Sequence, residues 1–370
     1  MASSSAHTKR LTKSISLATV LVIVSCCTHF ALAARELTPA GDDTAMRERY
    51  EKWMAEHGRT YKDSAEKARR FEVFKSNAHF IDSYHAAAGA GGKSRPALVT
   101  NKFADLTKDE FNAMYLRPRP VSPVIKTGFM YGDVRLEDIP ASIDWREKGA
   151  VTPVKDQTDA CDSCWAFSAV AAVEGIHQIR TQNLVELSVQ ELVDCSTGKN
   201  NRGCHLGDAA EAFRHIAHSG GITSEEDYKY EAQDSTCRAS GKQVAATISG
   251  FQHVPPQNET ALMLAVAHQP VSISLDGSSD VFRYFGTGVY GSASKRLEPG
   301  APNKPCNNTD LNHAVTVVGY GTDEEGIKYW LIKNSWGIDW GDLGYVKILR
   351  DVESKAGFCG LASDACYPVA

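Results

Sequence analysis

The stretch that decides the fold reads SCWAFSAVAAVEGI over residues 163–176. Alanine is abundant in it, and apolar residues from Phe167 to Ile176 recur at helical spacing, which predicts a buried helix. Cys164 lies at the start of this helix, where the helix dipole favours negative charge. A cysteine is a useful nucleophile only as the thiolate, and a helix N-terminus stabilises that form. The stretch therefore predicts a helix that carries a reactive thiol.

Two downstream motifs supply the partners that such a thiol needs. His313 lies in NHAV, residues 312–315, and can act as base and as imidazolium. Asn334 lies in KNSWG, residues 333–337, and its side chain can hold the imidazole ring in one orientation. A cysteine, a histidine and an asparagine in this order, each within matching text, resemble the catalytic triad of the papain/cathepsin-L family of cysteine peptidases.

The resemblance implies acyl transfer without a cofactor or a metal. Cys164 would attack a peptide carbonyl, and His313 would protonate the leaving amine and then activate water to release the thioester. The oxyanion would be held by the backbone N–H of Cys164 and the side-chain amide of Gln157. Asn334 would orient His313, and Trp336 would shield the hydrogen bond between them from water.

The resemblance also implies a substrate cleft. Gly207 would pair with the backbone of an extended substrate. In the pocket for the second residue upstream of the cleaved bond, two carboxylates and a serine replace generally apolar side chains. Carboxylates that face inward would favour Arg or Lys there, whereas carboxylates that point into solvent at the rim would not. The expected lining residues are Asp208, Ala209, Ser274, Leu311, Ala314 and Asp364.

Three departures from the family pattern lie near the nucleophile. Six residues, 158–163, separate Gln157 from Cys164, where the family normally has five. The extra residue could displace the Gln157 amide, and losing one oxyanion donor costs about 2.7–4 kcal/mol of transition-state stabilisation. Asp162 replaces a glycine, and it could narrow the first subsite or raise the thiol pKa by like-charge repulsion. CHLG, residues 204–207, replaces the usual C-x-G-G.

Size, charge and the N-terminus limit the protein class. A chain of 370 residues suggests two or three units, and 42% apolar and 23% charged residues are ordinary for globular proteins. The net charge of −5, without a sustained basic stripe, argues against a nucleic-acid partner. Residues 1–33 combine basic residues, an apolar run and a final ALA, which is typical of a secretory signal peptide; the competing interpretation is an uncleaved membrane anchor. We expect a secretory-pathway protein of the vacuole, lysosome or extracellular space, without membrane attachment after signal removal.

The cysteines are expected to form disulfides. Cys26 and Cys27 leave with the signal, and an oxidising compartment would pair most of the others, although spacing alone leaves the connectivity open. A C-x-x-C spacing at residues 161–164 also fits a metal site or a redox pair, but no second metal-ligand pair follows it, and the downstream His and Asn motifs argue against the redox pair. The family resemblance implies the pairs Cys161–Cys204, Cys195–Cys237 and Cys306–Cys359, with Cys164 free and Cys366 left over.

Residues 47–85 have the pattern of charged helices. Five residues recur along one helical stripe, which taken alone is ordinary amphipathic packing: Glu66, Arg70, Phe74, Asn77 and Ile81. The stripe resembles the E-x3-R-x3-F-x2-N-x3-I-x3-N stripe of the inhibitory prosegment of cathepsin-L-like zymogens, with His85 in place of the final Asn. VTNKFAD, residues 99–105, resembles the adjoining G-x-N-x-F-x-D motif, with Val99 in place of Gly. An extended proline-containing segment follows at residues 117–124.

These features divide the chain into a signal peptide (1–33), an inhibitory propeptide (34–138) and a mature peptidase domain (139–370). Processing is expected just before Ile139, where IPASIDWR resembles the mature N-terminus of the family. Helical patterns precede about residue 250, and alternating apolar runs follow it. We expect an α+β, two-lobed papain-like fold with a helical N-terminal lobe and a β-barrel-like C-terminal lobe, preceded by a helical prosegment.

The complete triad favours a cysteine endopeptidase made as a zymogen. The alternative is a papain-fold protein of weak or no activity that serves as a storage or binding protein. The expected partners are protein or peptide substrates, the chain's own propeptide as inhibitor and cystatin-like inhibitors, and the enzyme is expected to be a monomer. Asn258 and Asn307 lie in N-x-T triplets and are expected glycosylation sites.

Overall fold

The protein is described by a computed structural model that covers residues 40–87, 96–119, 128–292 and 306–370. The segment predicted as a signal peptide and the end of the proline-containing segment lie outside these residues. The described residues form two compact units that divide after Thr60. None of the helices in the described ranges has the length and apolar character needed to cross a bilayer.

The first unit contains the helix α2, Ala40–Glu56. Tyr50 and Trp53 are buried and their rings stack at 5.9 Å between centroids. The guanidinium of Arg59 lies 5.9 Å from the centre of the Trp53 ring, within cation–π range. Aromatic packing therefore fixes the end of this helix.

The second unit begins with the rest of the propeptide. Helix α3 spans Ser64–Ala86, and the Asp63 side chain caps it by accepting from the Glu66 amide. Strand β1, Ala97–Leu98, precedes helix α4, Lys108–Tyr115, which begins with a capping box of Thr107 and Glu110. The short 3-10 helix η1, Leu136–Asp138, lies just before the predicted start of the mature domain.

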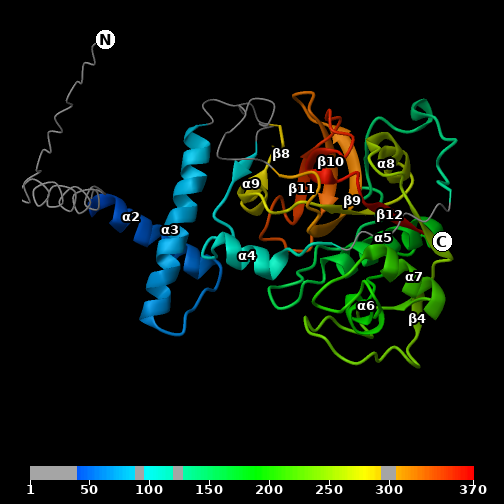
Figure 1. Ribbon diagram of the computed structural model, residues 1–370, viewed down its shortest axis with the longest axis horizontal. Helices are drawn as coiled ribbons and strands as arrows, with labels where there is room; N and C mark the ends of the chain where they lie inside the picture. Colours follow the sequence, from blue (N-terminus) through cyan, green and yellow to red (C-terminus); the bar gives the residue numbers. More distant parts are fainter. Residues whose placement is uncertain (1–39, 88–95, 120–127, 293–305) are drawn as a thin grey trace, which may run out of the picture. The chain divides into compact units, whose positions relative to one another are not determined.

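The N-terminal lobe of the mature domain is helical. Its central helix α5, Cys164–Thr181, is buried over most of its length and packs against α7, Ala209–Ser219, and α6, Val189–Cys195. The two-stranded sheet of β3, Ile222–Thr223, and β4, Val244–Ala246, borders these helices. Figure 1 shows α5, α6 and α7 in green on one side of the mature domain.

The C-terminal lobe contains an eight-stranded sheet in the order β5-β12-β6-β9-β10-β11-β8, with β2 paired to β9. The end strands β5 and β8 are not paired with each other in the described residues, so the sheet is open rather than a closed barrel. The strands span Ile143–Asp144 (β2), Gly250–His253 (β5), Val271–Leu275 (β6), Val289–Tyr290 (β8), His313–Thr322 (β9), Lys328–Lys333 (β10), Tyr345–Leu349 (β11) and Ala365–Val369 (β12).

Smaller elements complete this lobe: α8, Glu259–Val266; α9, Asp280–Arg283; β7, Phe285–Thr287; and η3, Phe358–Gly360. Strand β7 pairs with the propeptide strand β1 in antiparallel fashion. The predicted α+β, two-lobed fold with a helical prosegment is confirmed. Its two lobes meet where α5 packs against β9, and this contact positions the site.

Candidate active site

Cys164 is the first residue of α5 and is fully buried. Ser163 precedes the helix but makes no side-chain hydrogen bond to it, because its hydroxyl bonds to the Tyr230 hydroxyl at 2.6 Å. The backbone N–H of Ala314 donates to the Cys164 Sγ at 3.4 Å. This bond joins the start of α5 to the start of β9, so the thiol lies beside the residue that follows His313.

His313 is the first residue of β9, and Asn334 directly follows β10. Because β9 and β10 pair in antiparallel register, the two side chains meet, and His313 Nε2 lies 2.8 Å from Asn334 Oδ1. The Trp336 ring stacks on the imidazole at 4.5 Å between centroids and covers this bond. His313 Nδ1 is buried and has no hydrogen-bond partner within the described part of the chain. The second ring nitrogen therefore stays free for chemistry.

Gln157 is buried with one end of its amide held and the other free. Its Oε1 accepts from the Ser335 hydroxyl at 2.7 Å, and its backbone N–H donates to the Ser335 carbonyl at 2.8 Å. Its Nε2 has no hydrogen-bond partner among the described residues, as is expected of a donor that waits for an oxyanion. The lengthened loop turns at Thr158, where φ is +64°, and the Asp156 carboxylate accepts from the Thr158 amide. The anchoring to Ser335 thus holds Gln157 despite the extra residue.

In this precursor the electrostatics hold the cysteine and histidine neutral. Burial raises the pKa of the Cys164 thiol to about 12; the nearby Arg119 opposes this shift and Asp162 adds to it. Burial also lowers the pKa of His313 to about 3, against the opposing effect of its bond to Asn334. A thiolate–imidazolium pair therefore requires removal of the groups that cover the site.

The covering groups belong to the propeptide. Backbone N–H groups of Arg117 and Arg119 donate to the carbonyls of Asn312 and Leu311 at 3.0 and 2.9 Å. The Arg119 guanidinium reaches Asp162 Oδ1 at 2.7 Å, and both side chains are 2% exposed. The segment at residues 117–119 therefore covers the region beside Cys164.

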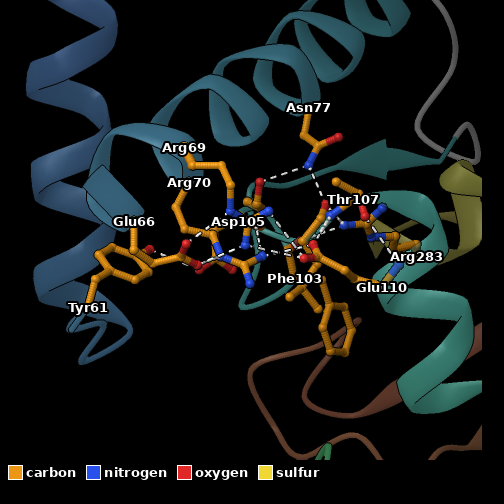
Figure 2. A network of polar contacts seen from close by, with 12 residues as sticks. Tyr61, Glu66, Arg69, Arg70, Asn77, Phe103, Asp105, Thr107, Glu110 and Arg283 are labelled. Atoms are coloured by element: carbon orange, nitrogen blue, oxygen red, sulfur yellow. Dashed lines mark hydrogen bonds and ion pairs between the residues drawn. The ribbon is translucent and has the colours of Figure 1, made fainter. Parts of the chain in front are cut away.

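A polar network orders the part of the propeptide that precedes this strand (Figure 2). Arg70 of α3 donates to Glu66 and to Glu110, each at 2.8 Å, and also to the Asp105 carbonyl. Asn77 donates from its amide nitrogen to the Ala104 and Leu106 carbonyls. Arg70 and Asn77 on α3 thus hold the turn before α4 in one conformation.

An aromatic cluster docks this ordered propeptide on the mature domain. The rings of Phe103, Phe111 and Tyr115 contact Trp336 edge-on at 5.4–5.8 Å between centroids. Buried Arg283 of the mature domain donates to the carbonyls of Phe103 and Leu106 (Figure 2). Since Trp336 also stacks on His313, the propeptide docks against the predicted triad.

His85 departs from the prosegment pattern but has a defined contact. Its Nε2 accepts the backbone N–H of Leu98 at 3.0 Å and so connects α3 to β1. His85 therefore tethers α3 to β1.

The residues expected in the substrate pocket have specific partners. The Asp208 carboxylate caps α7 by accepting from the Ala210 amide. The Asp364 carboxylate accepts from the Ser274 hydroxyl at 2.8 Å, and burial raises its pKa. A Cβ on Gly207 would lie 2.1 Å from the Trp165 ring, so only glycine fits there. The remaining expected residues Ala209, Leu311 and Ala314 are buried.

The part of the chain that the structure describes contains three disulfides, Cys161–Cys204, Cys195–Cys237 and Cys306–Cys359. Cys164 and Cys366 are free and buried. The first disulfide fixes the segment just before Cys164. The described residues hold no cluster of three or more His, Cys, Asp or Glu that could bind a metal ion.

Sequence reasoning missed Arg119 and Ser335. Ser335 orients Gln157, and its position next to Asn334 in the chain was the available signal. Arg119 lies in the proline-containing segment, for which the sequence predicts only an extended backbone. Asp162 was the available signal for Arg119, because a carboxylate that is buried beside Cys164 requires a cationic or hydrogen-bonding partner.

Comparison with known proteins agrees with this geometry. Residues 139–369 match the papain family cysteine protease domain, and residues 50–111 match the cathepsin propeptide inhibitor domain (I29). A senescence-specific cysteine protease, SAG39, of Oryza sativa subsp. japonica is 46% identical over 93% of this chain and 96% of its own. SAG12 of Arabidopsis thaliana is 42% identical over 94% of this chain and 97% of its own.

Solved precursors share the fold. The structure of a recombinant stem bromelain precursor has a TM-score of 0.77 and 41% identity, and the match covers 88% of this chain and 99% of that one. These relatives support a protease and not the alternative of a storage or binding protein. This chain belongs to the papain family of cysteine proteases and is a cysteine endopeptidase made as a zymogen with an inhibitory propeptide.

Proposed function

We propose that Cys164 is the nucleophile of this endopeptidase and that His313 is its acid and base. In the mature enzyme, His313 takes the thiol proton, and the thiolate attacks a peptide carbonyl. The imidazolium then gives its proton to the leaving amine, and the neutral ring activates water to hydrolyse the thioester. Asn334 holds the ring through the 2.8 Å bond to Nε2, which leaves Nδ1 for the proton transfers.

The observation that carries this proposal is the set of unpaired polar atoms around the buried thiol. His313 Nδ1 and Gln157 Nε2 are both buried without a partner in the described residues. An unpaired buried polar group costs free energy, so its retention favours a functional role. Gln157 Nε2 and the Cys164 backbone N–H would donate to the oxyanion, and Trp336 would keep water from the His313–Asn334 bond.

Maturation is proposed at the bond before Ile139. Residues 135–138 are all exposed, whereas Ile139 is half-buried and packs on the core of the C-terminal lobe. An exposed segment is open to a protease, and the residue after it remains held by packing. Residues 34–138 would then leave as the inhibitory propeptide, and 139–370 would remain as the peptidase.

The predicted signal peptide and the disulfides bear on the localisation of the enzyme. We propose that residues 1–33 direct the chain into the secretory pathway and that the enzyme acts in a vacuole, a lysosome or the extracellular space. The disulfides favour such an oxidising route. The mature enzyme is proposed to act as a monomer and to bind cystatin-like inhibitors in the cleft that the propeptide fills.

The carboxylate at position 364 bears on the proposed pocket for the second upstream residue. It is held by Ser274, and burial raises its pKa. A basic substrate side chain would supply a stronger partner for it than the serine does. We propose that this pocket tolerates Arg in the substrate. Its other proposed lining residues are Asp208, Ala209, Leu311 and Ala314.

The experiment compares His313→Ala with His268→Ala in the mature enzyme. His268 is a matched control because its ring bonds to the Leu264 carbonyl on α8, in another part of the lobe. His313→Ala is expected to abolish hydrolysis of a fluorogenic peptide, whereas His268→Ala keeps it. E64 is expected to block the wild type, since the bromelain protease of Ananas comosus, 43% identical over 62% of this chain, is solved in complex with it. Equal activity of both variants would refute the proposed role of His313.

A further inference from the structure

Asp162 lies beside the nucleophile and is paired only with propeptide cations in the described structure. Its Oδ1 accepts from Arg119 at 2.7 Å, and the Cys164 thiol lies 3.7 Å from the same oxygen. The Arg117 guanidinium is 3.8 Å from the other oxygen, Oδ2. Asp162 is thus the carboxylate that lies next to the reacting sulfur.

Both cations leave when the propeptide is removed, but Asp162 cannot move far. Its backbone N–H donates to the Cys204 carbonyl at 3.0 Å, and the disulfide between Cys161 and Cys204 fixes the neighbouring residue. The mature enzyme therefore presents an anchored carboxylate within hydrogen-bonding reach of the thiol and without its guanidinium partner. A carboxylate in such a partly enclosed site is stabilised by an incoming cation.

The contacts of Arg119 define where that cation would lie. Its guanidinium also donates to the Gly207 carbonyl at 3.4 Å, so it lies between the nucleophile segment and the glycine expected to pair with substrate backbone. The thiol attacks the substrate carbonyl carbon, so a side chain that reaches Asp162 belongs to the residue that carries this carbonyl. The position of Arg119 thus corresponds to the side chain of that residue.

We propose that Asp162 is a specificity-determining residue that selects Arg or Lys immediately before the cleaved bond, and that Arg119 occupies this subsite in the precursor as a stand-in for the substrate. The inference rests on the proposed role of Cys164 as nucleophile. It assigns a function to the residue that replaces the glycine of the family pattern. It also explains how the precursor tolerates a buried acid at this place.

The test uses mature wild-type enzyme and two peptides that differ only at the residue before the cleaved bond, Arg or Gln, with Leu before it in both. The quantity compared is the ratio of kcat/KM for Arg to that for Gln within one enzyme. Removing the Asp162 charge also changes the reactivity of the thiol, but both peptides meet the same thiol, so the ratio cancels this effect. Active enzyme is counted by stoichiometric labelling with a thiol-reactive epoxide, which also shows that a variant is folded.

Wild type is expected to prefer Arg, and Asp162→Asn is expected to lower the ratio by roughly tenfold or more, the effect of one lost charge-assisted hydrogen bond. Asp162→Glu keeps the charge and should retain most of the preference. Asp364→Asn is the matched control, because that carboxylate is bound by Ser274 and belongs to the pocket one residue further upstream. Its ratio should equal that of wild type.

A ratio that is the same in Asp162→Asn and wild type would overturn the inference and leave Asp162 as an anchor for the propeptide only. A wild-type preference for Gln would overturn it equally. Failure of the proposed function has a different signature: Cys164→Ser would then hydrolyse both peptides as fast as wild type. The two failures are therefore distinguishable in one set of enzymes.

Discussion

Replacing Phe103 with Ala should detach the propeptide from the mature domain without proteolysis of the chain. The Phe103 ring is fully buried and contacts Phe111 and Tyr115 of the propeptide at 5.0 and 4.9 Å and Trp336 of the mature domain at 5.5 Å between centroids. A buried Phe→Ala change costs about 3–5 kcal/mol. Its carbonyl, which accepts from Arg283, is retained in the variant.

Only part of that cost weakens docking. The contacts with Phe111 and Tyr115 lie within the propeptide and persist partly when it detaches, whereas the contact with Trp336 is lost on detachment. If roughly half of the cost applies to docking, the loss is about 2 kcal/mol. At about 1.4 kcal/mol per factor of ten, the open fraction of the Phe103→Ala precursor rises about 30-fold.

The assay is the rate at which a thiol-reactive epoxide labels the uncleaved precursor near neutral pH. Cys164 is fully buried, so labelling requires opening and its rate follows the open fraction. A gel confirms that the label is on the full-length chain. Phe129→Ala is the control, since Phe129 packs on Tyr131 and Tyr367 away from the triad. Equal labelling rates of Phe103→Ala, Phe129→Ala and wild type would refute the docking argument.

Three further predictions concern the triad, acid activation and glycosylation. Asn334→Ala is expected to lower kcat with little change in the unfolding temperature, because it frees the imidazole ring of the 2.8 Å bond; steady-state kinetics with thermal unfolding checks this. Arg69 and Arg70 of the same helix lower the pKa of Glu66 from 4.5 to about 2, so its contribution to the folded propeptide is present above pH 4.5 and is lost as the pH falls towards 2. Processing of the precursor should therefore accelerate in this window, and Glu66→Gln should speed it at higher pH; an identical pH profile would contradict the idea. Asn258 is exposed, and only its Oδ1 is used in capping α8, so its Nδ2 is available for a glycan. The Nδ2 of Asn307 instead donates to a carboxylate. Glycosidase treatment should therefore change the gel mobility of wild type more than that of Asn258→Gln.

Much of the fold was predictable because its patterns are local. Alternating apolar runs after about residue 250 predicted strands in that part of the chain, and the structure has β6 (Val271–Leu275) and β11 (Tyr345–Leu349) there. The helix that starts at Cys164 was equally clear, because its apolar positions recur at helical spacing over several turns. Short elements such as β2 and β8 carry too few residues for a pattern and depend on their partners in the sheet.

The site was predictable in its residue types but not in its electrostatic state. The NHAV and KNSWG motifs predicted that His313 and Asn334 form a pair, and the two side chains are in hydrogen-bonding contact. The pair between Arg119 and Asp162 joins residues 43 positions apart, and no local pattern reports such a contact. The pKa of about 12 for Cys164 is likewise a property of burial under the propeptide, which only the folded chain determines.

The central claim is that Cys164 is the nucleophile and that the propeptide alone keeps it inactive. The most direct measurement is titration of the acid-processed mature enzyme with a thiol-reactive epoxide, followed by mass spectrometry of the modified peptide and by the remaining peptidase activity. The account predicts that activity falls linearly to zero as the protein takes up one adduct, located on Cys164, while the uncleaved precursor is labelled far more slowly. Full activity in protein that carries the adduct on Cys164, or complete inhibition with the adduct on Cys366, would contradict it.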